Sequence, residues 1–144
     1  MELPQKNDVA SLVELRAYKP EDKAFIIATW LRGYYYGEKS IGEIDKQAFM
    51  SAYNLRLNAL LDSGKLDVRI MCLKEDHEVI LAYAVLSKSG EALHWIFTKS
   101  AWRKTGLAKS LVPVTINSVS HLTSVGRSIL KKYKEIIKYN PFLL

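Results

Sequence analysis

The residues best suited to chemistry lie in one stretch, where a bulky, strand-like run leads into a basic turn. Residues 93–97 read Leu-His-Trp-Ile-Phe, and residues 103–108 read Arg-Lys-Thr-Gly-Leu-Ala. A helix that begins at a glycine-bearing turn exposes unpaired backbone N–H groups, and its dipole adds positive potential there. Gly106 leaves room for phosphate oxygens beside the backbone, and the small Ala108 lets the helix pack near a ligand. Three bases supply formal charge at the same place: Arg103, Lys104 and Lys109. The segment therefore predicts a site for the phosphates of a ligand.

The histidines and the single cysteine suggest fewer chemical roles. His77, His94 and His121 stand far apart, without a ligand spacing such as His-x-x-x-His, so no metal site is predicted. His121 is suited by residue type to general-base work, although a buried, hydrogen-bonded histidine is the commoner role, and both interpretations stay open. Cys72 lies inside an apolar run and is predicted to be a small core residue rather than a nucleophile.

The apolar periodicity predicts the elements that position these residues. Residues 12–18 alternate as a half-buried strand does, and a helix begins at Lys19-Pro20 and ends between residues 33 and 37. A second helix covers residues 45–61 and is capped by Asp45. Three strands follow, over 66–73, 79–86 and 92–98, and the charged turn between the first two is typical of an antiparallel hairpin.

Beyond the basic turn the pattern continues with shorter elements. A helix from about Thr105 is kept short by Pro113, residues 116–123 are predicted to be a fifth strand, and residues 124–137 a helix. The apolar end, residues 139–144, adds a last short strand or docks on the core. The order β-α-α-β-β-β-α-β-α predicts a single α/β domain over residues 12–144, with a mixed, mostly antiparallel sheet flanked by helices. Residues 1–11 are predicted to be a leader.

Composition and charge narrow the classes of partner. The chain has 144 residues, enough for one domain, and charged residues interrupt every apolar run before it could cross a bilayer. The polar N-terminus does not resemble a secretory signal, so a cytoplasmic location is expected. Residues 98–144 hold nine Lys or Arg and one acid, Glu135, although the whole chain carries only +6. This asymmetry predicts a polyanionic partner, unless the last lysines simply form the solvated face of a helix.

The pattern Arg103-x-x-Gly106-x-Ala108, placed after a three-strand meander and before a helix, resembles the signature of the GNAT superfamily of N-acetyltransferases. The element order is similar to that superfamily over nearly the whole chain. The resemblance implies acetyl-CoA as cosubstrate, no metal, and direct attack of an amine on the thioester. It also implies a set of cofactor-binding residues, which hold the pantetheine arm by strand backbone and the pyrophosphate by turn N–H groups: Ile96, Phe97, Thr98, Arg103, Lys104, Thr105, Gly106, Leu107, Ala108 and Lys109.

The same resemblance implies catalytic and acceptor residues. Tyr133, the only tyrosine in the helix after the fifth strand, would protonate the leaving thiolate, although a packing role is the alternative. His121 becomes the candidate base, because no carboxylate lies on the fifth strand and Glu91 only precedes the fourth. The region between the first two helices shapes the acceptor site in this superfamily, which makes Tyr34, Tyr35 and Tyr36 candidates for its wall. Three adjacent tyrosines cannot share one helix face, so at least one is expected to be exposed.

Two further interpretations follow from the sequence. The short chain and its Tyr-Asn-Pro-Phe-Leu-Leu ending are similar to small acetyltransferase-like proteins of tailed phages. A catalytically silent GNAT-like protein, which binds nucleic acid or protein through its basic C-terminal third, is the alternative to an enzyme. Against nucleic acid, no recognised binding motif appears, and the bases are not interleaved with several aromatic residues.

Overall fold

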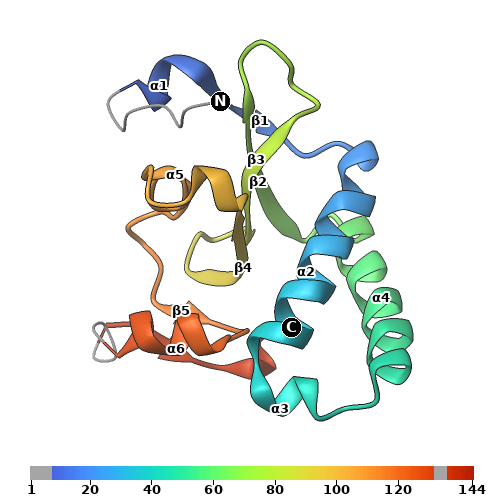
Figure 1. The fold of residues 1–144 in the computed structure, drawn as a ribbon. Helices are drawn as coiled ribbons and strands as arrows, with labels where there is room; N and C mark the ends of the chain where they lie inside the picture. The colour runs from blue at the N-terminus through green and yellow to red at the C-terminus, as the bar shows by residue number, and fades with distance from the viewer. Residues whose placement is uncertain (1–7, 132–135) are drawn as a thin grey trace.

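The computed structural model describes residues 8–131 and 136–144, which form one mixed α/β domain (Figure 1). Its helices are α1 (Val9–Leu12), α2 (Lys23–Gly37), α3 (Lys39–Gly42), α4 (Lys46–Asp62), α5 (Leu107–Leu111) and α6 (Ser124–Leu130). Its strands are β1 (Val13–Ala17), β2 (Leu66–Leu73), β3 (Ile80–Ser87), β4 (Ala92–Thr98), β5 (Ser118–Val119) and β6 (Lys138–Tyr139). Short 3₁₀ turns, η1 (Pro20–Asp22), η2 (Ser100–Trp102) and η3 (Pro141–Leu143), complete the chain.

The strands form one sheet in the order β1-β2-β3-β4-β5-β6. The first four strands pair antiparallel, which confirms the predicted hairpin and meander, whereas β4–β5 and β5–β6 pair parallel. Helices α2 and α4 cover one face of the sheet, and α1 and α5 cover the other (Figure 1). The predicted fold class, a single α/β domain with a mixed and mostly antiparallel sheet, is confirmed.

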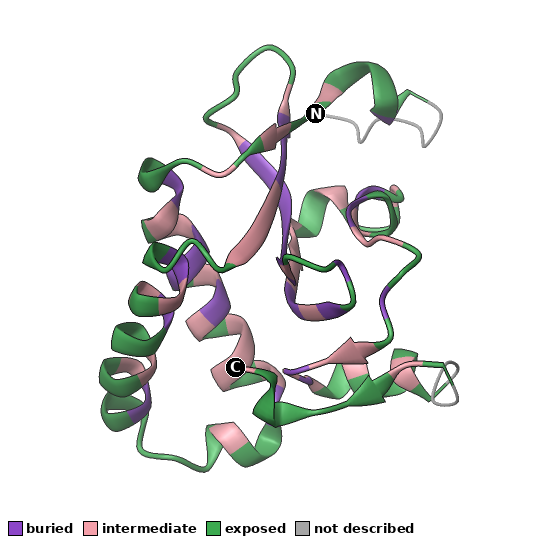
Figure 2. Ribbon diagram, turned by 180° about the vertical axis from the view of Figure 1, so that it is seen from behind, coloured by how far each residue is buried: buried purple, intermediate pink, exposed green. Residues whose placement is uncertain are grey.

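The core under α2 and α4 is built on large aromatic side chains. Trp30 of α2 and Trp95 of β4 stack with ring centroids 5.7 Å apart and planes 9° apart. Tyr83 of β3 is fully buried beside them, and its hydroxyl contacts Thr29 Oγ1 at 2.7 Å. Figure 2 shows β3 almost wholly buried, while α4 turns its outer face to solvent. Burial of this aromatic area is the main force that fixes α2 against the sheet.

A second core lies on the opposite face, beneath α5. Leu107 and Leu111 of α5 pack on Leu81 and Met71 of the central strands, and Val9 of α1 joins them. The expected leader, residues 1–11, is described only from Asp8 onward, and within that part Val9 is 4% exposed. Cys72 is fully buried beneath β1, so its predicted core position is confirmed.

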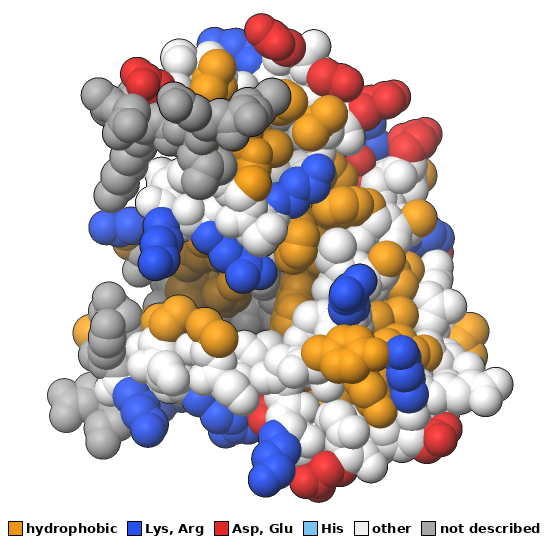
Figure 3. Space-filling view, in the orientation of Figure 1, with side chains coloured by type: hydrophobic (Ala, Val, Ile, Leu, Met, Phe, Trp, Pro, Cys, Tyr) orange, Lys and Arg blue, Asp and Glu red, His pale blue; other side chains and the backbone are white. Residues whose placement is uncertain are grey.

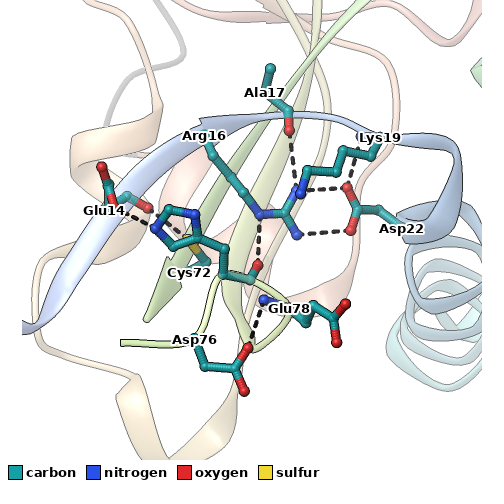
Figure 4. Close-up of polar contacts among 9 residues, drawn as sticks. Glu14, Arg16, Ala17, Lys19, Asp22, Cys72, Asp76 and Glu78 are labelled. Carbon is teal, nitrogen blue, oxygen red and sulfur yellow. Dashed lines mark hydrogen bonds and ion pairs between the residues drawn. The ribbon is translucent and has the colours of Figure 1, made fainter. Parts of the chain in front are cut away.

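A bidentate ion pair fixes the junction between β1 and α2 (Figure 4). Arg16 donates to both carboxylate oxygens of Asp22, at 2.7 and 2.8 Å, and its Nε donates to the main-chain oxygen of His77. Burial opposes ionisation of Asp22, but these bonds and the Lys19 N–H outweigh it and lower the pKa of the carboxyl group. The pair joins β1, η1 and the β2–β3 turn.

The C-terminal third is attached to α2 by a second ion pair. Glu38, 7% exposed at the end of α2, accepts from Arg127 Nη2 at 2.6 Å and from Nε at 2.9 Å. The Arg127 guanidinium also lies 5.8 Å from the ring centre of Tyr139 on β6. Arg127 therefore fixes α6 and β6 to the end of α2, which is one reason that the basic excess of this region is not all free surface charge.

Two predicted elements of this region are wrong in extent. The expected strand over 116–123 is reduced to Ser118–Val119, and the expected helix over 124–137 ends at Leu130. The reason is that Lys138 and Tyr139 form β6 and pair with β5, with Lys138 N donating to Asn117 O. A helix that continued through residue 137 would leave no residues between itself and β6, which begins at Lys138. The short strand expected near the end is confirmed in part, beginning one residue earlier, at Lys138.

Gly33 is required by the close approach of α2 to Trp95. A Cβ atom at this position would lie 2.8 Å from Trp95 Cζ2, and the ring cannot retreat because it stacks on Trp30. Gly33→Ala would normally gain helix propensity, but here we expect a loss of about 1–3 kcal/mol in the free energy of unfolding, measured by denaturant melting. Gly126→Ala in α6 is the matched control, because its Cβ would make only ordinary 3.5 Å contacts. If both variants proved equally stable, the tight Trp95 contact would be refuted.

Candidate functional site

The site begins where β4 and β5 separate. The two strands pair only at Ala92↔Ser118 and Leu93↔Val119, and the last bond joins Ser120 N to Leu93 O at 3.2 Å. The β3–β4 register shifts by one residue between Leu93 and Trp95, and beyond this bulge Lys99 N donates to Leu81 O of β3. Backbone groups of alternate residues point to the same side of a strand, so those of Ile96 and Thr98 face the opening. Neither residue's backbone bonds to β5 within the described chain. The fork therefore leaves a free strand edge over the second half of β4.

The basic turn follows this edge. Lys104 and Gly106 both have positive φ, 64° and 89°, and the backbone N–H groups of residues 104–106 donate to no other described residue. Thr105 Oγ1 donates to Trp102 O at 2.5 Å, which closes the turn. Leu107 is buried under the sheet, so α5 is held with its first turn beside the end of β4. Arg103 lies exposed nearby, its Nε 3.5 Å from Thr98 O.

Figure 3 shows the surface hollowed on this side of the molecule, between α5 and the β5–α6 region. Hydrophobic side chains form its floor, and Lys or Arg side chains lie along its edge. The sequence-predicted phosphate residues thus border an open depression. Within it, the turn of residues 103–108 offers N–H donors and positive charge, which suits an anionic ligand.

A pocket of about 490 Å³ lies at the other end of the fork. Its lining comes from α2, α4, the segment after β5 and the C-terminal η3 turn: Tyr34, Ala52, Tyr53, Arg56, Ser120, His121 and Pro141. Arg56 is the only ionised side chain in this lining, and it donates to the main-chain oxygen of Leu144. The pocket is therefore aromatic and weakly cationic.

Four side chains at this pocket form a hydrogen-bonded series. Tyr53 Oη contacts His121 Nε2, His121 Nδ1 lies 2.8 Å from Ser120 Oγ, and Ser120 Oγ lies 2.7 Å from His94 Nδ1. His94 and Ser120 are 2% and 3% exposed. They lie side by side because each is the first residue beyond the β4–β5 pairing.

Burial sets the ionisation of this series. Desolvation lowers the pKa of His94 to about 4 and that of His121 also to about 4, where the nearby His94 and Arg56 contribute further. The rings of Trp30 and Tyr34 lie edge-on to His121, with centroids 5.3 and 5.1 Å away, and cover part of its surface. Desolvation likewise raises the pKa of Tyr53. The series is therefore uncharged at neutral pH.

The structure brings some sequence-predicted site residues together and separates others. Tyr34 and His121 both line the pocket. Tyr35 instead donates to Ile44 O at 2.8 Å, and Tyr36 is exposed beside Lys46, so neither lines it. Tyr133 lies outside the described residues. Among the residues described, no three His, Cys, Asp or Glu side chains converge as metal ligands.

Sequence reasoning missed Tyr53, Arg56 and the pairing of His94 with Ser120. Tyr53 lies within the helix predicted over residues 45–61, and the structure places its side chain in the pocket wall. The spacing of His94 from the other histidines argues only against a metal site. Placing the predicted fourth and fifth strands side by side would have brought His94 near Ser120, which is the one clue that the sequence held.

The buried histidines make the fold sensitive to acid. Their folded-state pKa values, near 4, lie below the ordinary 6.5, so the unfolded chain binds more protons between these limits. We expect the free energy of unfolding to fall as the pH falls from 6.5 to 4, by up to roughly 3 kcal/mol for each histidine. His94→Gln should remove about half of this slope in melting curves, and the comparison cancels the contribution of carboxylates. Equal slopes would show that His94 is not held neutral.

No protein-family model matches this sequence, and no curated protein matches it either. Among solved structures, a predicted acetyltransferase with acetyl-CoA from Clostridium acetobutylicum superposes with a TM-score of 0.52 at 18% identity, over 85% of this chain and 88% of that one. A GCN5-related N-acetyltransferase from Rhodopseudomonas palustris gives 0.49 at 20% identity, over 78% of this chain. This chain spans 64% of the length of the Rhodopseudomonas protein.

A possible acetyltransferase from Clostridium difficile gives a TM-score of 0.49 at 14% identity, over 90% of this chain and 79% of that one. None of these proteins bears on the resemblance to phage proteins, which stays a prediction. No helix within residues 8–131 and 136–144 is long and apolar enough to span a membrane. The fold that the sequence resemblance predicts, a six-stranded mixed sheet flanked by helices, is similar to the fold of the Clostridium acetobutylicum acetyltransferase.

Proposed function

We propose that this chain is an acyltransferase that moves the acetyl group of acetyl-CoA to an amine by direct attack on the thioester. The observation that carries the proposal is the fork between β4 and β5, with a basic turn at one end and a pocket holding an uncharged histidine at the other. The Clostridium acetobutylicum structure with the same fold holds acetyl-CoA, which supports the choice of cosubstrate.

The end of the fork nearest the basic turn would bind the cofactor through backbone groups. The free edge of β4, over Ile96, Phe97 and Thr98, would pair with the amides of the pantetheine arm as another strand would. The N–H groups of residues 104–108 would hold the pyrophosphate, with Arg103, Lys104 and Lys109 supplying charge. The side chain of Leu107 packs in the core, so its contribution is the N–H group alone.

The pocket at the other end of the fork would bind the amine acceptor. A neutral amine entering beside Tyr34 would meet His121 where β4 and β5 part, which is where a thioester lying along β4 would end. His121 is uncharged at neutral pH and is therefore able to accept a proton from the attacking nitrogen through the Tyr53 hydroxyl that contacts its Nε2. Tyr133, outside the described residues, remains the proposed donor to the leaving thiolate. The identity of the amine is left open by this pocket.

The cofactor proposal predicts a thermal shift that depends on Gly106. Acetyl-CoA at millimolar concentration should raise the melting temperature, because a ligand that binds only the folded chain stabilises it. Gly106→Glu should abolish the shift, since a carboxylate at this turn would block and repel the pyrophosphate. The matched control is Gly64→Glu, because Gly64 also has a positive φ, 70°, and its Cβ would meet nothing within 4 Å. Both variants place a side chain on a residue with positive φ, and only Gly106→Glu should lose the response.

A flat melting curve for the wild-type protein would contradict the cofactor proposal. If the protein were then retained on DNA in a salt-dependent way, the nucleic-acid-binding alternative would be favoured. An acetyl-CoA shift that survives Gly106→Glu would place the cofactor away from this turn.

Arg103 is expected to contribute a charge-assisted hydrogen bond to the bound cofactor. Arg103→Ala should weaken acetyl-CoA binding by about 1–3 kcal/mol in calorimetric titration. The difference should shrink as salt is added, because part of the attraction is screened. Lys88→Ala removes an equal charge from the exposed β3–β4 turn and should leave the affinity unchanged. Equal affinities for Arg103→Ala and the wild type would assign Arg103 to the solvated surface.

A further inference from the structure

The hydrogen-bonded series at the pocket extends further than the transfer reaction described above requires. It begins at Tyr53 and His121, which line the pocket, and it continues through Ser120 to His94 of β4, which is 2% exposed. The distances from Ser120 Oγ to the two imidazole Nδ1 atoms are 2.8 and 2.7 Å. A serine that joins two imidazoles in this way can pass a proton from one to the other.

The direction of the donors follows from Arg56. Arg56 lines the pocket with Tyr53, and its guanidinium can only donate, so a phenol proton directed at His121 Nε2 leaves the phenol oxygen to face this cation. His121 must then carry its own proton on Nδ1 and donate it to Ser120. Ser120 in turn donates to His94 Nδ1, which leaves the His94 proton on Nε2. All the donors therefore point inward, from the pocket toward His94.

Burying two histidines is unfavourable for the fold. Desolvation holds both uncharged, and no carboxylate among the described residues hydrogen-bonds to either ring. Apolar side chains of similar volume would avoid the acid sensitivity argued above. A hydrogen-bonded polar series beside an aromatic core instead fixes ring orientation and proton positions. That arrangement is of use to a reaction that moves a proton.

We propose that Tyr53, His121, Ser120 and His94 form a proton relay for the acyl transfer, with Ser120 and His94 as positioning residues that act through His121. This inference rests on the proposed function. As the amine nitrogen bonds to the thioester carbon, its proton passes to Tyr53 Oη, and each group hands its own proton to the next, which leaves the added charge on His94. When the C–S bond breaks, the shifts reverse and the proton ends on the thiolate sulfur, which makes the relay the alternative to Tyr133 as the donor. The products are the amide and CoA thiol, and the relay returns to its starting state.

The proton positions can be tested without any acceptor. In protein labelled with ¹⁵N at histidine, long-range NMR correlations should find His121 protonated on Nδ1 and His94 on Nε2 at neutral pH. Ser120→Ala should release His121 from this single tautomer, whereas Ser118→Ala, a serine change on β5 two residues away, should leave it as in the wild type. Finding His121 protonated on Nε2 in the wild type would overturn the relay, because its first step needs a lone pair there.

Turnover separates proton transfer from mere orientation. With CoA thiol release as the assay, and water and a panel of primary amines as acceptors, Ser120→Ala should lower kcat by about a hundredfold, within the usual range for acid–base catalysis. KM for acetyl-CoA should stay unchanged. His94→Gln can still accept a hydrogen bond from Ser120 but cannot take up a proton. It should therefore keep the His121 tautomer and yet lose kcat as Ser120→Ala does.

The outcomes distinguish the relay from the proposed function. If Ser120→Ala turns over at the wild-type rate, the relay is wrong even though the acyltransferase stands. If His94→Gln keeps full kcat, His94 only orients His121 and stores no proton, which overturns the inner half of the relay. If the wild type shows neither thiol release nor a thermal shift with acetyl-CoA, the proposed function itself fails. In that case the relay proposal fails with it, because the relay is proposed for acyl transfer.

Discussion

The early end of the parallel pairing between β4 and β5 is the constraint on which the rest of the site depends. Two residue pairs hold the strands together, and then the chain after Ser120 departs to form the pocket wall and α6. This departure leaves the edge of β4 unpaired and gives the sheet an opening in its middle rather than at its rim. Unpaired backbone N–H and C=O groups inside a sheet favour the binding of a ligand that hydrogen-bonds to them. The reason is that a partly buried polar group without a hydrogen-bond partner is energetically unfavourable.

Aromatic packing keeps this opening in shape. The Trp30–Trp95 stack holds α2 against β4 and, with Tyr34 and Tyr53, surrounds the ring of His121. The same rings that stabilise the core also desolvate the histidine in part, which lowers its pKa and favours its uncharged form. Stability and chemistry are thus linked, because loosening the aromatic cluster would admit water and restore a more ordinary pKa to His121. The site therefore needs a rigid core directly behind it.

The opposite end of the fork is held by a different kind of contact. Leu107 and Leu111 anchor α5 in the second core. The position of α5 therefore constrains the backbone dihedral angles of the turn that precedes it. The positive φ of Lys104 is uncommon for a residue with a side chain, and this tertiary anchoring accommodates it. On the far side, Glu38 accepts two hydrogen bonds from Arg127 and so fixes α6 to the end of α2. The opening is consequently bordered by fixed elements on both sides.

The sequence alone determined the meander, the two long helices and the basic turn, because alternation, helical periodicity and a glycine between bases are local properties of the chain. It also indicated His121 as a base candidate. It could not determine that β5 would be two residues long or that the predicted last helix would end early, because both depend on pairing between β5 and β6. The contact of His94 with Ser120, and that of Tyr53 with His121, join residues 26 and 68 positions apart. Only the parallel strand pairing and the packing of α4 bring them together, since no local pattern encodes which distant side chains share a pocket.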